Sequence, residues 1–472
     1  MTKTLFAALA GAFCLVSLAA AAEPPGSRPS DRKAREIFAK VISIPTEVGR
    51  NKVPEMAEYL AGEFRAAGFP ADDVKVIPYH FTGDETAVLI VRYRGDGSGG
   101  RPIVLMAHMD VVTAKREDWE RDPYQLIEAD GFFYGRGTYD IKQGVTALTS
   151  TFLRLRQEGF KPKRDLIIYF SGDEETSQQT TVATVRDHRD LIDAEFALNS
   201  DSGGGTLDDD TGKPIYYSLQ AAEKTYADFA LTVRNPGGHS SLPRPDNAIY
   251  ELAAALGKVQ AYAFPVMHNE ITIASFRATG KTTPGELGAA MTKFAANPDD
   301  AAAAATLSAN PSYVGQVRTT CVATRLAGGH ADNALPQSAT ANINCRIFPG
   351  IKVDAVRAKL QELVGSGVTV TEPNPAMSSD PSPLRADVVG AVTRVVQKLR
   401  PGVPVVPNQA SGATDGLVFR AAGIPTYGTD GLFIRSKDDF SHGLNERVPV
   451  DGFYLCLDHW YLLLKDLAGK RK

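Results

Sequence analysis

The sequence predicts an α/β domain with a central, mostly parallel sheet, interrupted by a smaller α+β domain. In residues 23–221 and 374–472, short apolar strand-like runs alternate with amphipathic helical patterns. In residues 222–373 the order becomes strand, helix, strand, strand, helix, strand, which is a small unit complete in itself. We therefore predict that residues 222–373 are inserted into the α/β domain.

The first α/β part contains three helical patterns and four strand-like runs. We expect residues 114–130 to form a polar loop with an exposed Trp119. The predicted helices cover Ser30–Val41, Pro54–Ala67 and Val145–Gln157, and the strands cover Ala87–Tyr93, the run from Ile103, Leu166–Phe170 and Phe196–Leu198.

The inserted part and the C-terminal part are predicted in the same way. Residues 265–315 show no regular pattern, and we expect an irregular segment there. A loop is expected from the end of the 386–398 helix to Asp415. The other predicted elements are a strand at Tyr226–Arg234, helices at Ala248–Tyr262, Val353–Val364 and Ala386–Lys398, a strand at Val368–Thr371, and a terminal helix ending at Leu464.

The N-terminus has the pattern of a secretory signal peptide. Lys3 precedes an apolar run from Leu5 to Leu18, which is short for a membrane span, and alanines follow before Glu23. We predict cleavage after Ala22, hence a signal peptide at residues 1–22, an exported (periplasmic or secreted) protein and no stable membrane insertion after leader removal. An uncleaved N-terminal anchor is the alternative.

Composition and charge are those of an ordinary soluble globular protein. Hydrophobic residues make up 43% and charged residues 22% of the chain, and the net charge is −4. With no basic cluster in the sequence, we expect no nucleic-acid partner.

Three cysteines follow the predicted leader: Cys321, Cys345 and Cys456. Their spacing fits no zinc knuckle. Cys321 and Cys345 lie on two strand-like runs around a turn-rich loop centred near Asn333, so a hairpin would place them opposite each other. Whether they form a disulfide is left open at this point.

Polar residues gather where the buried strands end. His108 and Asp110 end one strand, Glu174 and Glu175 another, and Asp201 a third. Asp140 lies in a Gly-rich turn before a helix. In open α/β sheets, ligands bind at the carboxyl ends of the strands, so these side chains should meet.

A divalent cation would relieve the repulsion between so many carboxylates. Mixed histidine and carboxylate ligands without cysteine favour zinc, with cobalt or manganese as substitutes. Strand alternation puts His108 and Asp110 on one face, close enough for the carboxylate to accept the second N–H of His108. Of the eight histidines, His442 is the best candidate for a second imidazole ligand, because Gly443 lets the backbone turn closely there. For His108 and Asp110 taken alone, a polar strand end entering a loop remains an alternative.

The chain contains the motifs AHMDVV, GRGTYDIKQG, SGDEE, NSD and SHGLNERV, with GGHSS in the inserted part between the last two. This set resembles the zinc-dependent aminoacylase/carboxypeptidase family, which includes glutamate carboxypeptidase, acetylornithine deacetylase and succinyl-diaminopimelate desuccinylase. The resemblance is nearest to the Gly-Xaa and N-acyl-amino-acid carboxypeptidase branch. It implies a zinc-exopeptidase-like catalytic domain and an inserted lid or dimerisation domain.

The resemblance also implies a role for each metal ligand. Asp140 would bridge two zinc ions, with His108 and Asp201 completing one site and Glu175 and His442 the other. Asp110 would orient His108.

Further residues match positions at which the family contacts the substrate. Glu174 would be the general base, and His239 would stabilise the oxyanion, often across a dimer interface. Arg346 and Asn333 would bind substrate. Gly412 and Asp415 match a family loop near the site, and no role follows for them from chemistry.

The function implied is hydrolysis of an amide bond next to a free carboxylate, by a carboxypeptidase, dipeptidase or N-acyl-amino-acid hydrolase. The substrate would be a small peptide or an N-acyl amino acid, and the protein would form a homodimer through the inserted domain. One alternative is a deacylase or desuccinylase of amino-acid metabolism. Another is a catalytically silent binding protein on the same scaffold.

Overall fold

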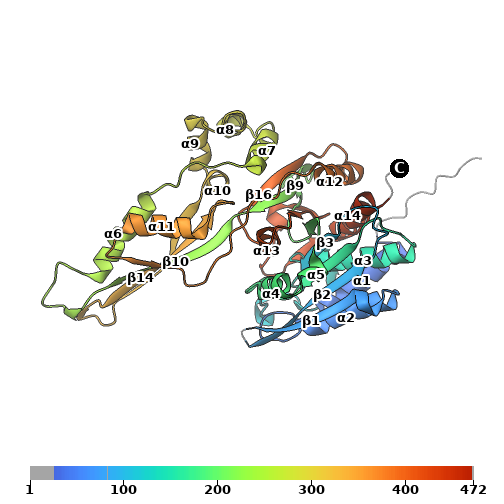
Figure 1. The fold of residues 1–472 in the computed structure, drawn as a ribbon, viewed down its shortest axis with the longest axis horizontal. Helices are drawn as coiled ribbons and strands as arrows, with labels where there is room; N and C mark the ends of the chain where they lie inside the picture. The colour runs from blue at the N-terminus through green and yellow to red at the C-terminus, as the bar shows by residue number, and fades with distance from the viewer. Residues whose placement is uncertain (1–25, 82, 470–472) are drawn as a thin grey trace, which may run out of the picture.

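The computed structural model describes residues 26–81 and 83–469, so the predicted leader lies outside the described residues. Figure 1 shows a large central domain, a second sheet that extends away from it, and a small group of helices above the junction. The second sheet belongs to the inserted domain.

The central domain is built on a ten-stranded sheet in the order β1-β2-β6-β3-β7-β17-β9-β8-β18, with β16 paired to β9. Its middle strands, β6, β3, β7 and β17, run parallel, and antiparallel pairs lie on either side. The strands are β1 (Val74–Phe81), β2 (Asp84–Tyr93), β3 (Ile103–His108), β6 (Leu166–Ser171), β7 (Phe196–Asn199), β8 (Gly204–Leu207), β9 (Pro214–Glu223), β16 (Val405–Ala410), β17 (Thr426–Gly428) and β18 (Phe433–Arg435). The predicted α/β fold with a mixed, mostly parallel sheet is confirmed.

Helices cover both faces of this sheet, as the continuously apolar strands require. On β3, Ile103 and Leu105 face one helix layer while Val104 and Met106 face the other. The first layer is α1 (Pro29–Ile42), α2 (Val53–Ala66), α3 (Lys142–Gln157), α12 (Ala386–Leu399) and α14 (Val450–Ala468), and the second is α4 (Gln179–Asp187), α5 (Arg189–Ile192) and α13 (Gly416–Ala421).

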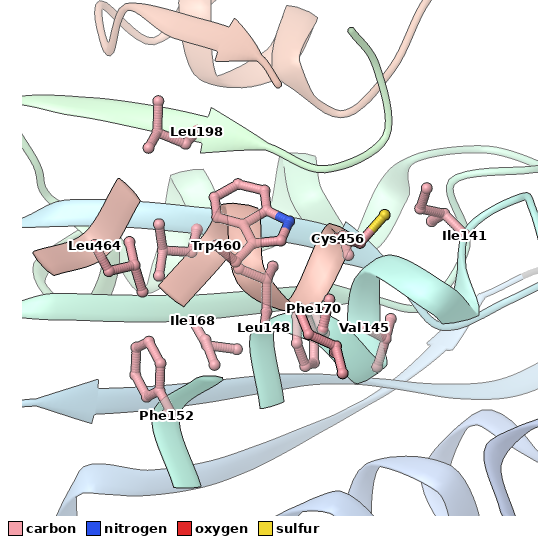
Figure 2. Close-up of a cluster of buried hydrophobic side chains, with 14 of the residues drawn as sticks. Ile141, Val145, Leu148, Phe152, Ile168, Phe170, Leu198, Cys456, Trp460 and Leu464 are labelled. Carbon is pink, nitrogen blue, oxygen red and sulfur yellow. The ribbon is translucent and has the colours of Figure 1, made fainter. Parts of the chain in front are cut away.

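The larger core lies between the sheet and α3 with α14 (Figure 2). Trp460 of α14 is fully buried and lies near Leu148 of α3 and Leu198 of β7. This core fixes the strand ends from which the candidate site residues follow. A separate three-stranded sheet, β4 (Ile127–Ala129), β5 (Phe132–Tyr134) and β19 (Arg447–Pro449), packs beside it.

The inserted domain is a four-stranded antiparallel sheet in the order β12-β14-β10-β15. Its apolar face packs against α6 and α11. The elements are β10 (Thr225–Arg234), α6 (Ala248–Ala261), β12 (Thr320–Gly328), β14 (Ser338–Ile347), α11 (Val353–Val364) and β15 (Thr369–Thr371), with a two-stranded pair, β11 (Gly238–His239) and β13 (Ala334–Leu335), beyond them.

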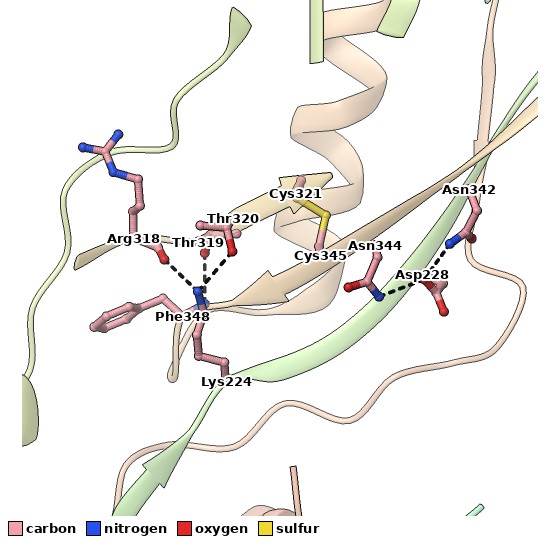
Figure 3. Close-up of a disulfide and its surroundings, with 10 residues drawn as sticks. All are labelled: Lys224, Asp228, Arg318, Thr319, Thr320, Cys321, Asn342, Asn344, Cys345 and Phe348. Carbon is pink, nitrogen blue, oxygen red and sulfur yellow. Dashed lines mark hydrogen bonds between the residues drawn. A yellow bond between two sulfur atoms is a disulfide. The ribbon is translucent and has the colours of Figure 1, made fainter. Parts of the chain in front are cut away.

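The expected hairpin places Cys321 of β12 opposite Cys345 of β14, and the two cysteines form a disulfide (Figure 3). Nearby, the buried Lys224 joins β9 to β10 and donates hydrogen bonds to the Arg318 carbonyl at 3.0 Å and to Thr320 Oγ1 at 3.4 Å. These contacts tie the start of β12 to the passage between the two domains.

The prediction of an irregular segment at residues 265–315 is wrong. The segment forms α7 (Glu270–Thr279), α8 (Gly285–Ala296), α9 (Ala301–Ala309) and α10 (Val314–Val317). Asn269 caps α7 and Asp300 caps α9, and Phe276, Met291, Phe294 and Leu307 form a separate small core. These helices are short and each buries only a few large residues, so no long apolar period marks them in the sequence.

Two further expectations are wrong. Trp119 is only 4% exposed, and its ring lies 5.1 Å from the guanidinium of Arg136. The expected loop before Asp415 contains β16, an edge strand parallel to β9 in which Pro407 is tolerated. Among the residues that the structure describes, no helix has the length and apolar character needed to span a membrane.

Candidate metal centre

Five polar side chains from five segments meet at one edge of the central sheet. His108 ends β3, Glu175 follows β6 and Asp201 follows β7. Asp140 lies in the turn before α3, and His442 in the loop before β19. Parallel strands end at the same edge, and this places residues far apart in the sequence side by side.

The side chains form two groups that share Asp140. His108, Asp140 and Asp201 form one, and Asp140, Glu175 and His442 the other, with the ligand atoms of each group within 4.8 Å of one another. Asp140 Oδ1 lies 3.2 Å from His108 Nε2, and Asp140 Oδ2 lies 3.0 Å from His442 Nε2. One carboxylate thus presents one oxygen to each group, the arrangement of a bridging ligand.

One further distance in each group completes its geometry. His108 Nε2 is 3.7 Å from Asp201 Oδ1, and His442 Nε2 is 3.0 Å from Glu175 Oε2. Two imidazoles and three carboxylates within this span match the donor set of two adjacent divalent cations. The residues therefore fit the metal that the sequence implies.

The electrostatics of the group also favour a bound cation. Burial raises the pKa of Asp201 to about 7, because an isolated carboxylate is poorly solvated there. Asp140 and Glu175 raise the pKa of His442 to about 10. Both shifts mean that the carboxylates require positive charge beside them, which a divalent cation supplies better than protons do.

Asp110 supports the site and belongs to neither ligand group. Its Oδ1 and Oδ2 accept the main-chain N–H groups of Glu174 at 3.1 Å and Glu175 at 3.0 Å. His108 Nδ1 lies 3.0 Å from the main-chain oxygen of Asp110 and 3.4 Å from its carboxylate, because β3 ends at His108 and the chain turns. The structure thus brings Asp110 to His108, as expected, and adds that Asp110 also holds the Glu174–Glu175 loop.

Glu174 lies beside the metal ligands without belonging to either group. Gln178 Nε2 donates to its Oε1 at 2.9 Å. Burial raises the pKa of Glu174 well above its usual value, and the nearby Asp201 raises it further. A carboxylate of raised pKa next to a metal site is suited to accept and return a proton.

Glu446 is a supporting residue to which the sequence analysis gave no role. It is fully buried, and its two oxygens accept the main-chain N–H groups of Gly137, Tyr139 and Asp140 at 3.1, 2.7 and 3.0 Å. It also pairs with Arg136 at 2.6 Å, and Arg136 Nη2 donates to the His442 carbonyl at 3.3 Å. The pair therefore fixes the two loops that carry Asp140 and His442. The only sequence signal was the acidic residue four positions after His442.

A cleft of about 670 Å³ opens above the ligands. Glu174, Glu175 and His442 line it from the central domain, and Arg346 from β14 of the inserted domain. Arg346 Nη1 donates to the Ser411 carbonyl at 3.0 Å and its guanidinium lies 4.7 Å from the Tyr226 ring. Gly412 lines the same cleft, and Asp415 lies behind it, accepting a hydrogen bond from Ser171.

The structure leaves His239 and Asn333 away from this cleft. Both are exposed, and the Asn333 carbonyl accepts the Ser240 N–H. They lie beyond the far end of β10, whose ten residues span about 30 Å from the junction with the central domain (Figure 1). Within one chain, the predicted oxyanion residue does not reach the predicted metal ligands.

Comparison with known proteins places this geometry in a family. A family model described as peptidase family M20/M25/M40 matches residues 104–466. The human N-fatty-acyl-amino acid synthase/hydrolase PM20D1 is 28% identical over 436 residues, which cover 89% of this chain and 84% of the relative. Mouse aminoacylase-1 is 24% identical over 452 residues, covering 93% and 96%.

Solved structures share the fold. The dipeptidase Dug1p from Saccharomyces cerevisiae has a TM-score of 0.67 at 16% identity, covering 93% of this chain and 97% of that chain. The M20 family metallo-carboxypeptidase Sso-CP2 from Sulfolobus solfataricus has a TM-score of 0.68 at 16% identity, covering 92% and 99%. The family resemblance inferred from the sequence motifs is confirmed.

Proposed function

This chain is a member of peptidase family M20/M25/M40, and we propose that it is a two-zinc hydrolase of an amide bond next to a free carboxylate. The observation that carries the proposal is Asp140, whose two oxygens face two separate ligand groups. Human PM20D1 is named for N-fatty-acyl amino acids and Dug1p for dipeptides, which supports a small peptide or N-acyl amino acid as substrate.

Zinc is the metal that the donors favour. Each group combines one imidazole with two carboxylates, with no thiolate, and cobalt or manganese would accept the same ligands. Two ions held there would polarise the scissile carbonyl and lower the pKa of the attacking water.

The chain's own residues would move the proton and hold the substrate. Glu174 would take the proton of the attacking water and return it to the leaving amine. Asp110 would keep Glu174 aligned through its main-chain N–H. Arg346, across the cleft, would grip the substrate carboxylate with two N–H donors.

We propose that His239 serves the site of a partner subunit in a homodimer formed through the inserted domain. Support comes from β12, an edge strand whose outer side has no partner strand among the described residues. Val322 and Leu326 on β12 are 58% and 69% exposed, and Tyr250 on α6 is 73% exposed. An unpaired edge strand beside exposed apolar side chains suits a two-fold interface between identical chains. Asn333, next to His239, would contact the same partner's substrate.

Export is also proposed. The predicted signal peptide is one support, and the Cys321–Cys345 disulfide is the other, since disulfides persist in oxidising compartments. A deacylase or desuccinylase of cytosolic amino-acid metabolism would have no use for either feature. A silent binding protein would not need to keep all five ligands and the base, and here they are present together.

Substitution of the base tests the proposal. Glu174→Gln should lower turnover by at least about 10²–10⁴-fold while bound zinc, measured by mass spectrometry, stays at the wild-type level. Glu128→Gln, at a half-exposed site on β4, is the matched control and should leave both unchanged. Wild-type turnover in Glu174→Gln would contradict the assignment.

A further inference from the structure

A second cavity of about 210 Å³ adjoins the metal centre and has no role in the function proposed above. It shares Asp140, Asp201 and Ser202 with the larger cleft, so both cavities border the same ligands. Arg346 lines the larger cleft only. A substrate centred on the metal ligands could therefore place one end in each cavity.

The inner end of this cavity contains buried polar atoms without partners. Asp430 is 4% exposed, and its Oδ2 accepts a hydrogen bond from Gln143 Nε2 at 2.8 Å. That bond turns the amide so that Gln143 Oε1 has no hydrogen-bond partner, and the buried Ser200 Oγ also has none. Both residues line the cavity. Leaving such atoms unpaired costs free energy. Ser200 Oγ can donate or accept, whereas Gln143 Oε1 can only accept, so Gln143 is the residue that points to a ligand with N–H or O–H donors.

The outer end of the cavity has the same chemical character. Asp439 and Ser441 line it there and both are exposed, with Asp439 Oδ1 accepting the Ser441 hydroxyl at 2.8 Å. No lysine, arginine or histidine is among the described residues that line the cavity. The larger cleft has Arg346 and His442. Carboxylates line both cavities, and the two differ because only the larger cleft also contains a fixed cation, Arg346.

We propose that this cavity, the acceptor pocket, binds an ammonium group on the acyl half of the substrate. The inference rests on the proposed function and narrows it. With the substrate carboxylate at Arg346, the acyl half extends past the metal ligands toward the acceptor pocket. An ammonium group matches an acceptor-lined site in both charge and hydrogen bonding.

The substrate class follows from this charge arrangement. A dipeptide with a free amino terminus has an ammonium group one carbon from the scissile carbonyl, directly beside the metal ligands that begin the pocket. At about 210 Å³, the pocket is smaller than the 300–1,000 Å³ typical of sites for larger ligands, and long acyl chains do not suit it. We infer that dipeptides are preferred over N-acyl amino acids.

An isosteric pair of substrates tests the inference on the zinc-loaded enzyme. Glycyl-L-leucine and N-propionyl-L-leucine differ by an ammonium group in place of a methyl group. We expect kcat/KM for glycyl-L-leucine to be greater by about 10²-fold, because a site built for a donor rejects the analogue that lacks it. Nα-acetyl-L-lysyl-L-leucine distinguishes the source of the ammonium group: faster hydrolysis than of the propionyl substrate would assign the pocket to side-chain ammonium groups as well.

Substitutions then locate the effect. Asp439→Asn should lower kcat/KM for glycyl-L-leucine by about tenfold and leave that for N-propionyl-L-leucine unchanged. Asp430→Asn should also lower kcat/KM for glycyl-L-leucine. Because Asp430 is buried and this variant can fail to fold, the exposed Asp439→Asn is the decisive substitution. Asp299→Asn, an exposed aspartate on the helical segment, is the matched control.

Three outcomes would overturn the inference while leaving the proposed function intact. One is faster hydrolysis of N-propionyl-L-leucine, and another is an equal loss on both substrates in Asp439→Asn. The third is a lower bound-metal content in Asp439→Asn, which would make the pocket a metal site. Failure of the proposed function looks different, because then neither substrate would be hydrolysed at all.

Discussion

The two ends of the molecule hold histidines in opposite environments. His108, at the edge of the central sheet, is 1% exposed and has a neighbour at each ring nitrogen. His239, at the far end of the inserted sheet, is exposed, and among the described residues its Nδ1 is hydrogen-bonded only to Ser241 of its own turn. The first histidine has a complete environment within one chain. The second acquires a catalytic environment only if another molecule supplies it.

The largest effect is expected for Asp140, the ligand that the two groups share. Asp140→Ala removes a carboxylate from both ligand groups, so bound zinc should fall and turnover should drop by at least about 10⁴-fold. Metal analysis and a turnover assay measure the two effects. Retention of both zinc ions would show that Asp140 does not bridge.

The next largest effect on turnover is expected at His239, which lies far from the metal ligands of its own chain. His239→Ala should lower kcat by about 10²–10³-fold with bound zinc unchanged, as loss of an oxyanion donor does. Mixing it with Glu174→Gln, under conditions in which subunits exchange, should restore roughly a quarter of wild-type activity. Half of the dimers would be mixed, and each mixed dimer would have one intact site. No recovery in a mixture shown to exchange would place His239 in its own chain's site.

Two similar buried ion pairs differ in whether they hold the loops that carry metal ligands. Glu446→Gln weakens the contact with Arg136, and we expect zinc affinity, measured against a competing chelator, to fall by about 10–100-fold. Glu223 is paired with Arg420 and equally buried, and its hydrogen-bond partners among the described residues are Gln220 and Thr414, neither of which is a metal ligand. Glu223→Gln should therefore alter stability with little change in zinc affinity. Equal losses of affinity would show that any buried pair has this effect.

A charge placed on the exposed side of the inserted domain should weaken dimer formation. Leu326→Lys places a charge on the β12 edge and should raise the dimer Kd by at least about tenfold, measured by analytical ultracentrifugation. Leu444→Lys, an exposed leucine of the central domain, is a comparison that should not change the Kd. A monomeric wild-type protein would remove the basis for this prediction and for catalysis by His239 in trans.

The smallest effect concerns the central core. Burial lowers the pKa of His459 to about 3, whereas an unfolded histidine titrates near 6.5. The unfolded state therefore binds a proton that the folded state excludes, and the free energy of unfolding falls as pH falls from 6.5 to 3. At pH 5 the contribution is about 2 kcal/mol. Urea unfolding at pH 7 and pH 5 should show a smaller loss for His459→Gln than for wild type, with the exposed His80→Gln as control.

Much of the fold could be predicted from the sequence. Val353–Val364 forms a helix with the predicted bounds, and β3 and β6 begin where their apolar runs begin. Such elements have a clear period and a clear stop signal, so local chemistry sets them. The helices at residues 270–317 lack a long apolar period, because each is short and buries only a few large residues against its neighbours and against β16.

The sequence by itself determined which polar residues follow the strands or lie in Gly-containing turns, and hence that His108, Asp140, Glu174, Glu175, Asp201 and His442 were candidates for metal chemistry. A strand end is local, and its polar residues can be read in order along the chain. The resemblance implied that Asp140 bridges the two groups, and the structure places one of its oxygens at each. Only the tertiary structure decided that Glu446 holds the Asp140 loop and that His239 lies far away. These relations join segments separated by hundreds of residues. They depend on which strands pair and where each loop packs, and no local pattern encodes that.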